Sequence, residues 1–227
     1  MVNWDYVASL DFMVAWEFRH ALLSGLGITL VFFGLGGGLG FVGGTCLTVL
    51  HRSGARPLPW LVTAFVELFR NTPLLVQLMW IHFALPTVTG IRMSVFESSL
   101  LALSLNVSAY MSEVIRAGID AVPKSQWEAG RALGLSPGVI WLQIVLPQAL
   151  RIVLPPMANT MVSLLKGTAV LSILAVAELM RATTRISTHT VRPVELFTVA
   201  AIVYFLVGLA AVHGFAWLER RFQLRTG

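Results

Sequence analysis

The sequence predicts an all-α integral membrane protein, a helical bundle with about five transmembrane helices. Hydrophobic residues make up 56% of its 227 residues and charged residues only 12%, and the mean hydropathy is +0.79. A soluble domain carries charge on about a quarter of its residues, so the excess apolar surface requires lipid around it. At about 20 residues per crossing, the chain accommodates about five spans and short loops.

Five apolar stretches are the predicted spans, and they divide the chain into three parts. Residues 1–21 place apolar side chains at near-helical spacing among acids, and we expect them to lie on the outer membrane surface. A membrane domain at 22–220 follows, and 221–227 form a short tail. The predicted spans are about 22–50, 59–85, 95–119, 156–179 and 195–217, with a polar loop at 120–155.

The first two spans carry features that affect packing. Glycines crowd the middle of the first span, between residues 34 and 44, and small residues allow close helix approach in lipid. In the second span, Pro73 lacks a backbone donor and disfavours helical geometry at Thr72. We expect a break there, which needs protein or a water-filled cavity to satisfy the backbone. Alternatively, Arg70 reaches the cytoplasmic headgroups by snorkelling.

Basic residues set the predicted orientation. With the loops at 51–58 and 116–155 and the tail inside, nine Lys and Arg residues are cytoplasmic and five are outside. The N-terminus is therefore expected outside and the C-terminus in the cytoplasm. The net charge of +5 lies mostly beside the spans, where it sets topology and does not indicate nucleic-acid binding.

Several enzyme classes are disfavoured by what the sequence lacks. No Gly-rich phosphate loop ending in Gly-Lys-Ser/Thr occurs, and the spans leave no room for an ATPase domain of roughly 200 residues. We expect no cofactor in this chain, and ATP with Mg²⁺ only in a partner. The five histidines are scattered and form no metal or haem ligand set. No Gly-x-Ser-x-Gly nucleophile motif supports a hydrolase.

The polar loop contains the most informative segment. Residues 124–133 favour a short helix, and Gly134 is suited to end it. Ser136 is expected to cap a second helix with Pro137 at its first position. Pro147 then ends or kinks that helix. The pattern predicts two short helices at a sharp angle on the cytoplasmic face.

Two interpretations of this loop remain open from the residues alone. Trp127 is an unusual aromatic on a small polar helix, and beside Glu128 and Arg131 it suits docking into the groove of a partner. Alternatively, the segment is a plain helical loop packed on the spans of its own chain.

The loop also resembles a known pattern, the signature loop of ABC importer permeases. That pattern reads Glu-Ala-Ala, three residues, Gly, nine residues, Ile, one residue, Leu-Pro. Here Glu128, Gly134, Ile144 and the pair at 146–147 hold those places. The chain departs once, with Gly130 in place of Ala, which costs about 0.8–1 kcal/mol of helix propensity.

Further segments resemble the polar amino-acid group of these permeases, which includes histidine, glutamine and glutamate permeases. The segments at 67–77 and 109–119 are close to its second-span motif and to the stretch before the signature loop. Residues 25–30 resemble its first-span start, and 166–170 match a Lys-x-Thr-Ser-Leu pattern more loosely. The resemblance covers 22 to about 220.

The resemblance implies a five-span subunit in a bacterial inner membrane. Its partners would be a second permease subunit of the same or a homologous chain, two ATP-binding subunits inside, and an amino-acid-binding protein outside.

The signature helix would insert into a cleft on an ATP-binding subunit. Glu128 is the first candidate for coupling, preferably by capping or bracing the neighbouring turn, and Gly134 sets the angle between the helices. The implied coupling residues are Gln126, Trp127, Glu128, Ala129, Gly130, Arg131, Gly134, Ile144, Leu146 and Pro147.

A translocation path is expected among the polar groups within spans, since ionisable groups there are functional candidates. An amino acid offers a carboxylate and an ammonium group, which opposed cations and acids would complement. Lys166 and Glu178, placed on one helix, would be about 18 Å apart and could not grip one ligand together. Headgroup or interhelical contacts are the alternative for each. The candidates are Arg70, Asn71, Thr72, Glu113, Lys166, Thr168 and Glu178.

The charged residues also favour one class of substrate. Arg70 and Lys166 favour an acidic amino acid, glutamate or aspartate, as does the basic outer loop containing Arg181, Arg185 and Arg192. Those three arginines either meet acidic patches on the binding protein or are solvated loop cations.

The alternative functions are an ion-coupled secondary carrier, which usually has internal repeats, and a non-transporting membrane scaffold.

Overall fold

The computed structural model describes residues 9–223, and every regular element among them is helical. This confirms the all-α class. In chain order the elements are α2 (Met13–Glu17), α3 (Arg19–Arg52), α4 (Leu58–Asn71), α5 (Leu74–Met79), the π-helical η1 (Trp80–Ala84), α6 (Leu85–Thr89), α7 (Val95–Asp120), α8 (Lys124–Ala132), α9 (Pro137–Val139), the π-helical η2 (Ile140–Val145), α10 (Leu146–Thr168), the 3₁₀-helical η3 (Ala169–Leu174), α11 (Leu179–Thr190) and α12 (Pro193–Gln223).

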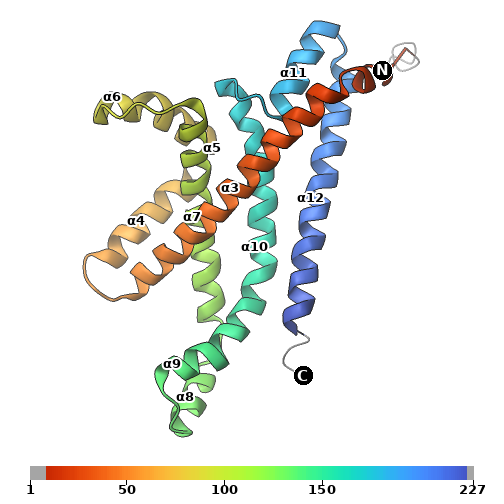
Figure 1. Cartoon of the computed structure of the whole chain (residues 1–227). Helices are drawn as coiled ribbons and strands as arrows, with labels where there is room; N and C mark the ends of the chain where they lie inside the picture. The colour runs from red at the N-terminus through yellow and green to blue at the C-terminus, as the bar shows by residue number, and fades with distance from the viewer. Residues whose placement is uncertain (1–8, 224–227) are drawn as a thin grey trace, which may run out of the picture.

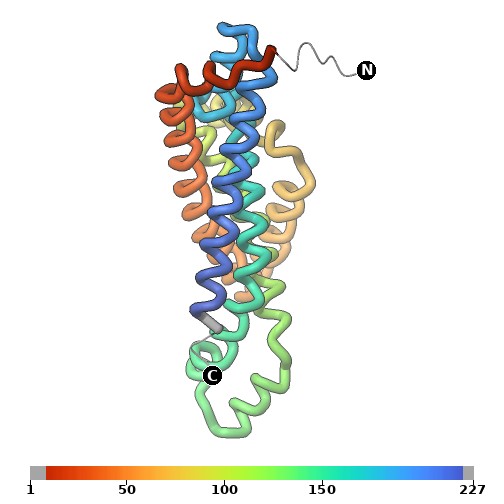
Figure 2. Tube along the Cα trace, turned by 90° about the vertical axis from the view of Figure 1, so that its right-hand side faces the viewer, coloured from red at the N-terminus to blue at the C-terminus, as the bar shows by residue number. Residues whose placement is uncertain are grey.

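The long helices form an elongated bundle. α3 crosses it diagonally, with α4 to α6 standing on one side of α7, and α10 and α12 on the other (Figure 1). α7 contacts α3, α4 and α10, and α10 also contacts α12. The pair α8 and α9 projects at one end, and α2 and α11 lie at the opposite end (Figure 2).

Three helical stretches are long and apolar enough to cross a membrane, and the bent pair α4 to α6 is a fourth if it counts as one span. α7 has 26 residues, which is about 39 Å at 1.5 Å per residue and exceeds the hydrocarbon core of about 30 Å. Its serines lower its hydropathy, but neighbouring helices cover Ser104, Ser108 and Ser112. By length and apolar composition the described residues hold three or four candidate spans, and α7 stands at the place of the predicted span at about 95–119.

Glycines let α3 approach α7 closely, as the glycine-rich sequence of the first predicted span indicated. A Cβ atom built on Gly40 would collide with Val107 of α7. On Gly44 it would lie 2.7 Å from the Met111 Cβ and 2.9 Å from the Ser112 backbone nitrogen. Thr48, one turn further, donates to the Ser112 carbonyl at 3.2 Å. The glycine-rich face of α3 is therefore a packing surface for α7.

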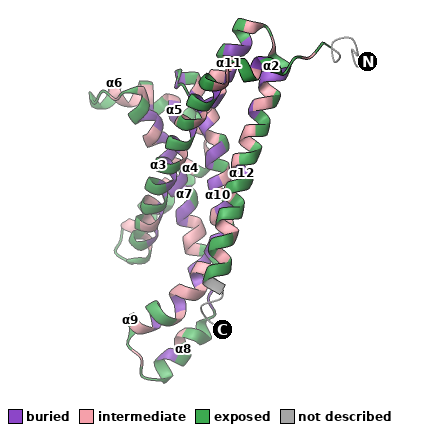
Figure 3. Ribbon diagram, turned by 45° about the vertical axis from the view of Figure 1, so that its right-hand side comes forward, coloured by how far each residue is buried: buried purple, intermediate pink, exposed green. Residues whose placement is uncertain are grey.

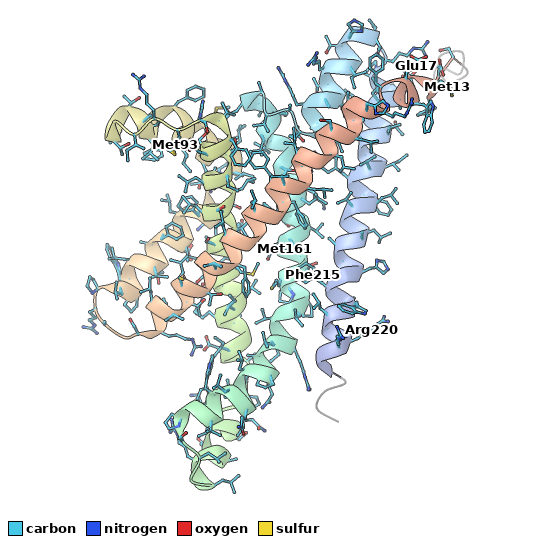
Figure 4. The ribbon with its side chains drawn as sticks, viewed as in Figure 1. Met13, Glu17, Met93, Met161, Phe215 and Arg220 are labelled. Carbon is cyan, nitrogen blue, oxygen red and sulfur yellow. The ribbon has the colours of Figure 1, made fainter. Side chains whose placement is uncertain are left out.

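The same face of α3 also packs against α10. Met161 lies where α10 crosses α3 (Figure 4), and its Sδ would be 3.1 Å from a Cβ on Gly37. Phe32 and Leu103 are buried in the core that joins α3, α7 and α10. Buried residues line this centre, whereas much of α12 is exposed (Figure 3). Those exposed side chains on α12 are largely apolar, as a lipid-facing surface requires.

The helix that contains the predicted fourth span begins well before residue 156. α10 runs from Leu146 to Thr168 with Pro155 and Pro156 inside it, and a continuous helical stretch covers Pro137–Leu174. This helix therefore extends into the segment 120–155, which was predicted to be a polar loop with two short helices. Prolines are tolerated inside membrane helices because neighbouring groups and local adjustments satisfy the freed carbonyls.

Lys166 and Glu178 do not share a helix, which corrects the argument based on their spacing. α10 ends at Thr168, η3 ends at Leu174, and Ala175 takes a left-handed conformation at φ 59°. Glu178 is the N-cap of α11. It thus lies beyond the fourth span, whereas Lys166 lies within it.

The terminal segments follow the predictions only in part. The proposed interfacial segment contains α2, which has Val14 buried and Trp16 exposed, but α3 already begins at Arg19. At the other end α12 continues helically to Gln223, into the predicted tail. The remainder of both predicted segments lies outside the described residues.

Candidate functional site

α8 ends as its sequence predicts. Gly134 has φ +73°, a left-handed conformation that glycine adopts without steric penalty. The Gly134 N–H donates to the Arg131 carbonyl at 2.9 Å, and the Leu135 N–H donates to the Gly130 carbonyl at 3.1 Å. These two bonds form a Schellman motif. Gly134 therefore turns the chain sharply after α8.

Of the two outcomes predicted for the second short helix at Pro147, an end or a kink, the structure excludes the end. Ser136 is the N-cap of α9 and Pro137 follows it, as predicted, but the Ser136 side chain makes no capping hydrogen bond. α9 continues through η2 into α10. Thus α8 is a separate short helix, whereas α9 is the first part of a longer helical stretch.

The π-helical segments account for how the helix passes Pro147. In η2 the Leu146 N–H reaches back five residues to the Trp141 carbonyl, and Pro147 follows directly. In η1 the Leu85 N–H likewise bonds the Trp80 carbonyl, and Pro86 comes next. A π segment shifts the register of the bonds by one residue, so a proline without an N–H fits the following turn.

The inner face of α8 packs on η2. Trp127 is only partly exposed and its ring centroid lies 6.0 Å from that of Trp141, which favours the interpretation in which this segment packs on its own chain. Gly130 is buried, and a Cβ there would lie 2.8 Å from the Cγ1 of Ile140 and 3.3 Å from the Cδ1 of Ile144. Glycine in place of the usual alanine thus allows α8 to approach η2.

The outer face of α8 is free. Gln126, Glu128, Ala129 and Arg131 are exposed, and Gln126 accepts a weak hydrogen bond from Gln148 of α10 at 3.4 Å. Glu128 makes no hydrogen bond or ion pair with any described residue, so the predicted capping or bracing within the chain is not observed.

An apolar residue that the sequence analysis did not select accompanies this exposed face. Leu133, the last residue before Gly134, is 76% exposed. The signal was present in the sequence, because the positions three and four residues from Leu133 hold only glycine, alanine, serine and proline, so no large apolar side chain lies beside it on the helix. Of the remaining coupling candidates, Leu146 and Pro147 are half-buried where η2 joins α10.

The predicted break after Asn71 is present and is built by side chains. α4 ends at Asn71 and α5 begins at Leu74, with the bent pair turning by 109°. Pro73 cannot donate to the Phe69 carbonyl, four residues back. Gln77 donates to that carbonyl at 2.8 Å and Asn106 of α7 at 3.3 Å. The freed acceptor is thereby satisfied within the protein.

Other groups complete the end of α4. Gln77 also donates to the Thr72 carbonyl at 3.0 Å and the Thr72 hydroxyl at 2.8 Å, and it accepts from Asn106 at 3.0 Å. The Tyr110 hydroxyl of α7 donates to the Arg70 carbonyl at 3.2 Å. Sequence reasoning did not select Gln77, Asn106 or Tyr110, although a proline inside a span signals that donors must come from elsewhere.

A groove of about 740 Å³ lies beside this break. It brings together Arg70, Asn71 and Thr72 with Lys166, four of the predicted path residues. The polar groups that α7 and α10 add to its lining are Asn106, Tyr110, Asn159, Thr160 and Ser163. Among the residues that the structure describes, no acidic side chain lines the groove, so the side-chain charge of this lining comes from Arg70 and Lys166.

Glu113 does not belong to the lining of this groove but forms ion pairs with two arginines. Its Oε2 lies 3.4 Å from Arg70 and 2.8 Å from Arg116. The Arg70 guanidinium also lies 5.7 Å from the centre of the Tyr110 ring, within the range of a cation–π contact. Glu113 therefore positions Arg70, and its acidic charge is shared with a second cation.

Two predicted path residues lie away from the groove. Thr168 is fully buried and donates to the Leu165 carbonyl at 2.6 Å. Glu178 is fully buried and accepts hydrogen bonds from the Met180 and Arg181 N–H groups and from the Tyr204 hydroxyl at 2.7–2.8 Å. Glu178 thus anchors α11 to α12 and is not brought to the groove.

Comparisons with known proteins agree with this geometry. Residues 36–224 match the family described as binding-protein-dependent transport system inner membrane component. The arginine transport system permease protein ArtQ of Bacillus subtilis (strain 168) is 34% identical over 201 residues, which cover 88% of this chain and 92% of that protein. The L-cystine transport system permease protein TcyB of the same organism is 40% identical over 163 residues, 71% of this chain and 69% of that protein.

Solved structures share the fold. A crystal structure of an amino acid ABC transporter with histidines superposes with a TM-score of 0.86 at 32% identity, covering 94% of this chain and 99% of that chain. The methionine ABC transporter MetNI, in inward facing conformations, gives a TM-score of 0.75 at 19% identity, covering 91% and 98%, and shows the fold alone. The resemblance to ABC importer permeases of the amino-acid group is confirmed, and this membrane-spanning chain belongs to the family of inner membrane components of binding-protein-dependent transport systems.

Proposed function

We propose that this chain forms the translocation path of an importer for a polar amino acid, with the groove beside the α4–α5 break as the site that the substrate passes. The supporting observation is the lining of that groove. It gathers two cations and several amide and hydroxyl groups from α4, α7 and α10. These are the donors that a carboxylate in a partly dry site requires.

We further propose that the substrate is acidic, glutamate or aspartate. Relatives are named as permeases for arginine, glutamine and cystine, and each of those amino acids carries an α-carboxylate, of which cystine has two. Arg70 and Lys166 supply two positive charges without an acid in the lining. A second carboxylate on the substrate would match the second cation.

The driving force is proposed to come from separate subunits. Two ATP-binding subunits would hold ATP and Mg²⁺, and each would take the exposed face of one α8 helix, at Glu128, Arg131 and Leu133. Reversing a 1:99 preference between inward-open and outward-open states takes about 5.5 kcal/mol of differential binding. Closure of an ATP-bound pair can supply this energy, whereas one small ligand rarely does.

The proposed assembly also fixes the orientation. In a bacterial inner membrane, α8 and the end of α12 would face the cytoplasm, and α2 and α11 would face outward, where an amino-acid-binding protein delivers substrate. A second permease subunit would complete the pair. This orientation is supported by the excess of basic residues at the α8 end.

Reconstituted uptake tests the groove. Arg70→Gln and Lys166→Gln are each expected to reduce uptake of labelled glutamate at least about tenfold at saturating binding protein, since a lost charged hydrogen bond is worth about 1.5–3 kcal/mol. Arg56→Gln, an exposed cation outside the groove, is the matched control and should transport normally. Equal rates in all three variants would remove the groove from the path, and uptake of arginine but not glutamate would refute the acidic substrate.

A parallel experiment tests the coupling helix. Glu128→Lys and Gly134→Asp should lower transport-coupled ATP hydrolysis, because the first reverses an exposed charge and the second puts a side chain at a left-handed position. Uptake that continues without any ATP-binding subunit would instead indicate an ion-coupled carrier.

A further inference from the structure

A second cavity lies at the end of the bundle opposite α8. It measures about 590 Å³ and is bounded by the start of α3 and by α11. Three basic side chains, Arg181, Arg185 and His189, line it along one side. They follow one another at four-residue spacing on α11, so they share one helix face. We call this face the basic face of α11.

The basic face has no acidic counterpart. Among residues 9–223, no carboxylate lies within ion-pair distance of Arg181, Arg185 or His189, and no acid lines the cavity. Arg192, just beyond α11, is different because it lies 3.3 Å from Glu195 and 3.8 Å from Asp11. The fold thus neutralises the neighbouring arginine and leaves this face positively charged.

The helix carrying this face is fixed in place. Its reverse side buries Leu179 and Thr183. Its first turn is capped by the buried Glu178, and the Leu179 N–H donates to Thr29 of α3 at 3.1 Å. The cations on the outer side are therefore presented on a rigid support, which lowers the entropy lost when a partner binds.

The usual distribution of basic residues across a membrane does not account for the charges on the basic face of α11. In the proposed orientation α11 faces outward, and basic residues are normally depleted on that side of a membrane. A cluster that opposes this bias, lacks internal partners and borders a cavity with an apolar floor is suited to an external anionic group that carries apolar neighbours.

We propose that the basic face of α11 is the docking surface for an acidic patch of the extracytoplasmic binding protein, with one partner carboxylate entering the cavity between Arg181 and Arg185. This inference rests on the proposed function, because it takes the importer and its orientation as given. It adds the location and the charge of the docking surface.

The cavity also adjoins the fourth span. Ala175 and Ala177 belong to its lining, and they form the turn that joins η3 to α11. A side chain bound in the cavity would contact this turn directly. Docking would thereby touch the outer end of the helical stretch whose other end lies beside α8.

Stimulation of ATP hydrolysis by the binding protein tests the proposal. The assembled transporter is reconstituted in phosphatidylcholine vesicles, and the substrate-loaded binding protein is titrated in. Arg181→Glu combined with Arg185→Glu should raise the half-saturating concentration at least about tenfold, because like charges facing one another oppose docking. The salt dependence of docking should weaken as well. Arg92→Glu, another exposed cation placed on the outer side, should leave both values unchanged.

The possible outcomes distinguish a failure of the proposed function from a failure of the docking surface alone. A wild-type transporter that no binding protein stimulates would refute the proposed function and this surface with it. A stimulated wild type with an unshifted double variant, or a shift equally large for Arg92→Glu, would overturn the docking surface alone. A defect that appears only after phosphatidylglycerol is added would show that lipid headgroups occupy the basic face, and would also overturn it.

Discussion

Asn106 on α7 donates a hydrogen bond to Gln77 on α5 at 3.0 Å, and both side chains donate to the carbonyl of Phe69. This carbonyl is the acceptor that Pro73 leaves without a helical donor. The break in the second span is thus held by two amides on different helices, and one of these amides, Asn106, also lines the groove beside the break.

Removing one of these amides should destabilise the break. We expect Asn106→Leu to reduce the free energy of unfolding by about 1–3 kcal/mol, the range for leaving a buried polar group unsatisfied. Thermal unfolding of the purified permease in detergent measures the loss. Asn159→Leu is the control, since Asn159 is exposed in the same groove and makes no hydrogen bond within the described chain. Similar losses for both would contradict the role given to Asn106.

A methyl group on the packed face of α3 should separate it from α7. In Gly44→Ala the new Cβ meets backbone atoms of α7 at 2.9 and 3.0 Å, and such overpacking typically costs about 1–3 kcal/mol. Gly38→Ala places its methyl group where no atom lies within 4 Å, so its melting temperature should not fall. Equal melting temperatures for the two variants would refute close packing at Gly44.

Gly130 should behave as a contact residue of Ile140. Gly130→Ala adds helix propensity worth about 0.8–1 kcal/mol but crowds the Ile140 side chain at 2.8 Å. We expect a net loss of stability that Ile140→Ala in the same chain largely removes, giving a coupling energy of about 0.5–3 kcal/mol in a double-mutant cycle. Additive effects would show that α8 and η2 do not press on one another here.

Glu178 should hold α11 in place. Glu178→Ala removes an N-cap that accepts from two backbone N–H groups and from Tyr204, at an expected loss of about 0.5–2 kcal/mol. Amide hydrogen exchange should accelerate within α11 first. Glu128→Ala changes an exposed carboxylate without partners and should stay within about 0.5 kcal/mol of the parent. Unchanged exchange in α11 would refute the anchoring role.

Local chemistry made part of this structure predictable. Ser94 and Glu97 form a capping box that starts α7 near the predicted residue 95. Gly134 ends α8, and the pair of Thr72 and Pro73 interrupts the second span. In each case the deciding groups lie within a few residues of one another, so the sequence displays them together.

The errors arose where distant residues decide. Two adjacent prolines such as Pro155 and Pro156 disfavour a helix on their own, but here they lie inside a helix supported by its neighbours. Trp127 reads as exposed because its partner, Trp141, comes from a later helix. Asn159 and Ser163 are ordinary polar residues along α10, and only packing brings them opposite Arg70.

The unbroken helical stretch Pro137–Leu174 has 38 residues, which is about 57 Å at 1.5 Å per residue and nearly twice the hydrocarbon thickness of about 30 Å. It begins directly after the turn at Gly134 and ends at the left-handed Ala175. No loop interrupts it, so a tilt imposed at its inner end displaces its outer end on the far side of the bilayer. The stretch bends where α9 and η2 pass into α10 (Figure 1), so the stiffness of that bend and of the turn that holds the two prolines would limit how faithfully such a motion is transmitted.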